Sequence, residues 1–128
     1  MPVVATTAAT VITWATAVGI MVIGARCLWA PRAAADFGIP GTRTDDPNFR
    51  AWLSVKAVRD IGSGLFLLIV LLGGGTRLHG WMMLAGSSIA LGDALITKLS
   101  GGPATAYYGI HGCTAAVMAA AGAVLLLS

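Results

Sequence analysis

Hydrophobic residues fill four long stretches of this chain, and polar breaks separate them. Lys, Arg, Asp and Glu are absent from residues 1–25, 61–76, 78–92 and 99–128. A helix needs about 20 apolar residues to cross the roughly 30 Å hydrocarbon core of a bilayer. The first and last runs meet this length alone, and the two middle runs reach it once neighbouring charged residues are included. The pattern therefore predicts four membrane helices.

Turn-forming residues place the helix ends. Asp46 and Pro47 suit the N-cap and the first position of the second helix, and Pro31 lies just beyond the first. A short interfacial turn is expected around residues 32–37. Short connections make consecutive helices antiparallel neighbours. We predict an all-α fold, an integral membrane four-helix antiparallel bundle in a single domain of residues 1–128. Its helices are expected at about 7–29, 47–72, 78–99 and 104–127.

Composition strengthens the membrane interpretation. The chain is 57% hydrophobic and only 10% charged, whereas a soluble domain carries about 25% charged residues to face water. The formal net charge is +3, but the basic residues lie beside helix ends rather than on an extended soluble face. We therefore exclude nucleic-acid binding.

The positive charges predict the orientation of the helices. Cytoplasmic loops of membrane proteins carry an excess of Lys and Arg. Of the eight such residues, Arg77 alone falls on the side of the N-terminus. We therefore expect a multi-pass protein with non-cytoplasmic termini and a cytoplasmic connection between the first two helices. The other seven basic residues are Arg26, Arg32, Arg43, Arg50, Lys56, Arg59 and Lys98.

Ionisable residues inside the predicted helices are the main functional signal. A charged side chain at the bilayer centre costs at least about 2.5–3.5 kcal/mol and usually marks a functional site. At 1.5 Å per residue, the ionisable side chains of all four helices come within about 5–15 Å of the same surface. They are Arg26, Lys56, Arg59, Asp60, Asp93 and His111.

These residue types suit acid–base chemistry. A carboxylate beside a histidine forms a proton-exchanging pair, so Asp60, Asp93 and His111 are the predicted catalytic residues. Arginine binds a carboxylate or enolate oxygen through paired hydrogen bonds. The predicted substrate-binding residues are Lys56, Arg59, Arg26 and Tyr107.

We therefore expect a small membrane enzyme that catalyses an isomerisation, a cyclisation or an epoxide opening. Its expected partners are the bilayer and a lipophilic small molecule with an anionic or carbonyl oxygen. No cofactor or metal is predicted. A haem would need two histidines at similar depth, but His79 and His111 fall at opposite ends of the antiparallel bundle. Cys27 and Cys113 lack the spacing of a metal site.

Non-catalytic alternatives stay open. Arg59–Asp93 and Lys56–Asp60 ion pairs could simply fix the register of the helices, in a membrane subunit or a protein that binds a lipophilic ligand. Transport is the weaker alternative, because four short helices would have to form an oligomer. A homo-oligomer is compatible with each function.

One family resemblance covers nearly the whole chain. The motifs are Asp36-Phe37-Gly38-Ile39-Pro40, then Lys56-x-x-Arg59-Asp60-x-x-x-Gly64, then Asp93-Ala94 and His111. With these motifs the chain resembles the membrane family catalogued as domain of unknown function 4267, within a broader DoxX-like group. The resemblance implies a four-helix membrane fold and suggests that the charged residues are a family feature, but it implies no activity.

Overall fold

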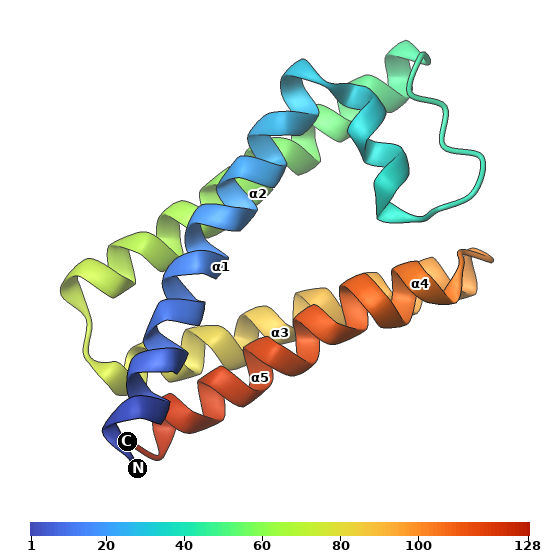
Figure 1. The fold of residues 1–128 in the computed structure, drawn as a ribbon. Helices are drawn as coiled ribbons and strands as arrows, with labels where there is room; N and C mark the ends of the chain where they lie inside the picture. Colours follow the sequence, from blue (N-terminus) through green and yellow to red (C-terminus); the bar gives the residue numbers. More distant parts are fainter.

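Two antiparallel helix pairs make up the fold. A computed structural model describes residues 1–128 and contains helices but no strands. The first pair joins α1 (Val3–Trp29) to α2 (Pro47–Gly73), and the second joins α3 (Thr76–Leu99) to α5 (Cys113–Leu126). The pairs meet at the end that carries both termini and diverge towards the other end (Figure 1). We call these the closed end and the open end.

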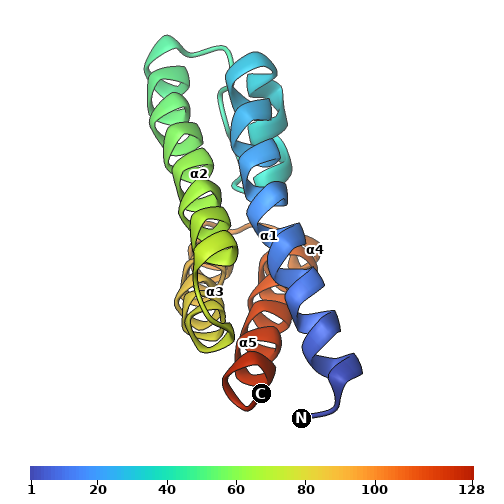
Figure 2. The same ribbon diagram turned by 90° about the vertical axis from the view of Figure 1, so that its left-hand side faces the viewer.

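This arrangement is looser than the predicted bundle. Contacts are dense within each pair, much fewer between α1 and α5, and sparse between α2 and α3. Figure 2 shows the α1–α2 pair leaning away from the α3–α5 pair above the termini. The structure shows an all-helical protein of two hairpins, and it does not confirm a regular four-helix bundle.

Most of the predicted helix ends are correct to within a few residues. Pro47 begins α2, and the Asp46 carboxylate accepts a hydrogen bond from the Asn48 amide at 2.9 Å. The expected turn after α1 is a 3₁₀ helix, η1 (Pro31–Phe37). The fourth helix begins as predicted at Ala104, but it has three parts: α4 (Ala104–Ala106), the π-helix η2 (Tyr107–Gly112) and α5.

Small residues allow the helices of each pair to approach closely. A Cβ added to Gly64 of α2 would collide with the Ala17 carbonyl of α1. A Cβ on Gly122 of α5 would come within 2.9 Å of the Gly80 carbonyl of α3. Such contacts are typical of membrane helices, whose association depends on close packing because lipid is as apolar as the helices.

The core is small and lies mainly towards the closed end. Only 20 of 128 residues are buried, and Met83 and Leu125 are the largest fully enclosed apolar side chains. Many large apolar residues are exposed instead, among them Phe66 and Leu72. Three helical segments, Val3–Trp29, Thr76–Leu99 and Ala104–Leu126, are long and apolar enough to cross a membrane. The exposed apolar surface is that of a membrane protein.

Candidate functional site

The site begins with an ion pair on α2. Lys56 and Asp60 are one helical turn apart, and Lys56 Nζ donates to Asp60 Oδ2 at 2.6 Å. The Asp60 side chain is 17% exposed and that of Lys56 42%. Gly24 of α1 lies against the Asp60 Cβ, so α1 shields the carboxylate while the lysine stays partly accessible. This is one of the two ion pairs that the sequence suggested.

Phe37 connects this ion pair to the other helix pair. Lys56 Nζ lies 5.5 Å from the centre of the Phe37 ring, within the range of a cation–π interaction. The His111 ring of η2 packs against the same ring with 4.2 Å between centroids. The segment that carries Phe37 lies between the two helix pairs at the open end (Figure 1). Phe37 thus lies where α2 and η2 would otherwise face each other directly.

The Phe37 carbonyl also determines which ring nitrogen of His111 carries the proton. His111 is buried, and its Nε2 lies 2.8 Å from the Phe37 carbonyl oxygen. A carbonyl can only accept a hydrogen bond, so Nε2 must carry the proton. In the neutral imidazole the lone pair is then on Nδ1. Nδ1 is therefore the nitrogen available to act as a base.

Local backbone geometry brings Phe37 to this position. η1 ends at Gly38, whose φ of +100° is a left-handed conformation that favours glycine. A Cβ on Gly38 would collide with Ala106 and come within 3.3 Å of the Thr97 side chain. Close packing of Gly38 on the ends of α3 and α4 therefore holds η1 between the helix pairs.

Asp93 of α3 completes the cluster. It is half-buried and lies within electrostatic range of His111, Lys56 and Asp60. Its carboxylate forms no ion pair, because the single salt bridge of the chain is Lys56–Asp60. One turn further on, the hydroxyl of the fully buried Thr97 has no hydrogen-bond partner. The cluster therefore contains a carboxylate that is not neutralised by a direct partner.

The two predicted arginines lie apart from this cluster. Arg26 and Arg59 are exposed, and the suggested Arg59–Asp93 ion pair is not formed. Each arginine follows by two residues a buried small residue at the α1–α2 contact, Gly24 and Ala57 respectively. Two residues correspond to about 200° around a helix, so both arginines face away from the partner helix. Arg59 comes three residues after Lys56, so helical spacing predicts that both lie on one face. The structure shows that this face of α2 is not turned towards α1 at Arg59.

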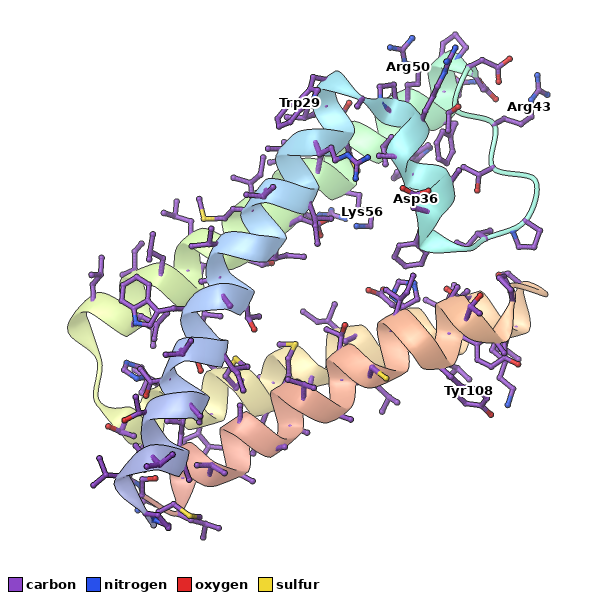
Figure 3. The ribbon with its side chains drawn as sticks, viewed as in Figure 1. Trp29, Asp36, Arg43, Arg50, Lys56 and Tyr108 are labelled. Carbon is purple, nitrogen blue, oxygen red and sulfur yellow. The ribbon has the colours of Figure 1, made fainter.

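Tyr107 lies in a separate aromatic cluster at the open end. Its ring packs edge-on against Tyr108, with centroids 4.6 Å apart. Lys98 Nζ lies 5.8 Å from the Tyr107 ring and 5.7 Å from the Tyr108 ring. Figure 3 shows Tyr108 pointing away from the gap between the pairs, whereas Lys56 lies on the side of the gap. Phe37 was not among the predicted site residues, although it belongs to the family motif Asp36–Pro40 in the long connection.

The other histidine and the two cysteines lie outside the charged cluster. His79, expected at the interface with water, is half-buried, and its Nε2 lies 3.0 Å from the Val70 carbonyl oxygen. Cys27 and Cys113 are unpaired. No group of three or more His, Cys, Asp or Glu side chains is arranged to hold a metal ion. Two surface hollows, of about 620 Å³ and about 440 Å³, are lined by residues outside the charged cluster.

These features define an all-helical membrane protein with ionisable groups gathered between its two helix pairs. The family model described as Domain of unknown function (DUF4267) matches residues 17–125. The chain belongs to this family, as its motifs suggested. The match includes Phe37, the Lys56–Asp60 pair, Asp93 and His111. Neither the curated proteins nor the solved structures contain a match to the chain.

Proposed function

We propose that this protein is a membrane-embedded enzyme that performs acid–base chemistry on a lipophilic small molecule. The observation that carries the proposal is the environment of Asp93: its half-buried carboxylate has no direct partner and lies within electrostatic range of ionisable groups on two other elements. An ionisable group within a membrane is energetically costly, and such groups usually mark functional sites.

Each member of the cluster has a distinct role in this proposal. Asp93 and His111 Nδ1 exchange protons with the substrate, because both are acceptors that the structure leaves without a hydrogen-bond partner. Lys56 binds or polarises a carbonyl or anionic oxygen, since its ammonium group is partly accessible and can donate three hydrogen bonds. Asp60 orients that lysine. The reaction class is an isomerisation, a cyclisation or an epoxide opening.

The orientation in the membrane is part of the proposal. α2 packs antiparallel along α1, so in this proposal it crosses the membrane with α1, although four charged residues lie in its first half. Arg43 and Arg50 lie at the open end (Figure 3), together with Arg32 of η1 and with Lys98 beside Tyr107, whereas Arg77 lies beside the termini at the closed end. The excess of cations at the open end supports its placement on the cytoplasmic side.

Asp93→Asn is the sharpest test of the enzyme proposal. The substitution keeps the shape of the side chain and removes its ability to accept a proton. We expect the variant to accumulate in membranes as the wild type does, and to lose the change in the lipophilic metabolite profile that expression of the wild type produces. Mass spectrometry of total lipid extracts from the two strains measures the difference.

The same experiment distinguishes the non-catalytic alternative. Lys56–Asp60 and His111–Phe37 are contacts that a purely structural cluster would also contain. If the wild type and a fully folded Asp93→Asn variant give identical extracts, the enzyme proposal is wrong. Loss of folded protein in Asp93→Asn, with Ser88→Ala as a control on the same helix, would indicate that the cluster is structural.

A further inference from the structure

A groove on the second helix pair lies beside the charged cluster. It has a volume of about 440 Å³, within the range of small-molecule sites. Thr16 of α1 forms one wall, and η2 and α5 form the rest. The residues of this second wall are Gly109, Ile110, Cys113, Thr114, Val117 and Met118.

The walls of the groove offer no free polar group apart from a thiol. Thr16 donates its hydroxyl hydrogen to the Ile12 carbonyl at 2.8 Å, and Thr114 donates to the Ile110 carbonyl at 2.7 Å. Both threonines therefore present mainly their methyl groups. Because the groove lies between two segments long and apolar enough to cross a membrane, it opens to hydrocarbon rather than to water. Its surface suits an apolar chain.

The groove and the charged cluster share structural elements. His111 belongs to the same π-helix as Gly109 and Ile110. Met118, at the other end of the groove, reaches α3, where its Cε would lie 2.6 Å from a Cβ on Gly86. Gly86 lies on the face of α3 that also carries Asp93, two turns away. A molecule in the groove therefore lies next to the helix faces that carry His111 and Asp93.

We infer that this groove binds the hydrocarbon chain of the substrate, which is an amphiphile that enters from the bilayer. The chain lies along residues 109–118 while the oxygen-bearing head group reaches Lys56, Asp93 and His111. This inference rests on the proposed function for the head group, and it adds the substrate class and the route of entry. It also gives a role to η2, since π-helical turns often occur at functional sites.

Photolabelling with a long-chain fatty acid tests the inference. The probe carries a diazirine near the end of its chain, and its carboxylate provides the anionic oxygen. The protein is reconstituted in phosphatidylcholine nanodiscs, irradiated and digested, and the labelled residues are identified by mass spectrometry. We expect labelling to concentrate on residues 109–118 and near Thr16. An equal spread over all exposed helical surfaces would show only bulk lipid contact and would overturn the inference.

Gly109→Leu closes the groove with little disturbance elsewhere. A Cβ at Gly109 meets no atom within 4 Å, so the added side chain fills open space. We expect labelling of residues 109–118 to fall by about tenfold, a 1.4 kcal/mol change in binding. Gly62→Leu is the matched control, because Gly62 is equally open but lies on α2 outside the groove. Val117→Phe narrows the same groove from α5 and should have the same effect. If both filling variants are labelled like the wild type, the groove does not bind the chain.

Asp93→Asn separates this inference from the proposed function. Labelling is measured on the wild type, because the head group is inferred to reach Asp93, and the metabolite profile is measured on the Asp93→Asn variant. If labelling of the wild type concentrates on the groove, but Asp93→Asn gives the same metabolite profile as the wild type, only the enzyme proposal is refuted. Uniform labelling together with an Asp93-dependent profile would refute the groove alone.

Discussion

Each end of the molecule contains a histidine bound to a main-chain carbonyl, but the two bonds hold different kinds of structure. At the closed end, His79 donates to Val70, nine residues earlier in the chain. At the open end, His111 donates to Phe37, 74 residues away. The first bond secures a tight turn between consecutive helices that apolar packing already brings together. The second bond joins two segments that are otherwise held together mainly by the contacts of Gly38 and Phe37.

The two ends of the molecule also differ in the residues that hold them together. The closed end is built from small and apolar residues such as Gly80, Gly122 and Leu125. The open end contains the ion pair, the unpaired carboxylate and the buried imidazole, with η1 between the helix pairs. We expect changes at the closed end to unfold the protein. Substitutions at the open end should mainly detach η1 from its position between the helix pairs.

The largest expected effect is at the closed end. Gly122→Val should lower the free energy of unfolding by about 3 kcal/mol, because the new side chain would collide with the Gly80 carbonyl and Leu84. Unfolding of the detergent-solubilised protein, followed by circular dichroism, measures this. Gly92→Val is the control, since a Cβ there meets no atom within 4 Å. Equal stability of the two variants would show that the α3–α5 contact does not determine stability.

The next largest changes in the free energy of unfolding are expected for substitutions of the two histidines. His111→Ala should cost about 2 kcal/mol, because it removes a buried hydrogen bond and the contact with the Phe37 ring. His79→Ala should cost about 1 kcal/mol, the value of one half-buried hydrogen bond. Hydrogen exchange locates the effect, and we expect faster exchange over residues 31–38 only in the His111 variant. Faster exchange there in both variants would contradict the proposed independence of the two ends.

The smallest effect concerns the Lys56–Asp60 ion pair. Because Lys56 is 42% exposed, the pair should contribute less than about 1 kcal/mol. A double-mutant cycle with Lys56→Gln and Asp60→Asn measures this coupling energy directly. A coupling above about 3 kcal/mol would mean that the pair is a structural element of the core rather than an accessible part of a binding site.

Much of the fold could be predicted from the sequence, because apolar run length and turn residues determine where membrane helices begin and end. Asp46, Pro47 and Gly38 occupy the positions that their conformational preferences suggest. The separation of the helix pairs could not be predicted, since it depends on which helices pack against each other. The same limit explains the wrong prediction for Arg59. Spacing shows which residues share a face with Lys56, but it does not show that Ala57 and Gly64 lie on the face turned towards α1.

The candidate site was predicted in part for a related reason. Lys56, Asp60, Asp93 and His111 were identified because charge is costly in an apolar helix. Phe37 was present only as part of the motif Asp36–Pro40, because an aromatic residue in a connection does not by itself indicate a site. Its role depends on the left-handed backbone of Gly38, whose contact with Ala106 lies far away in sequence. Long-range contacts of this kind leave no local pattern.

The contact between Phe37 and His111 also has a consequence for biosynthesis. Residues 1–73 contain a complete helical hairpin that can form while the rest of the chain is still being made. The imidazole partner enters the membrane only with the last segment. During synthesis from the N-terminus, the α1–α2 hairpin with Lys56 and Asp60 is therefore complete before His111 can donate its hydrogen bond to the Phe37 carbonyl. The acid–base chemistry proposed for this site therefore requires the last helical segment as well.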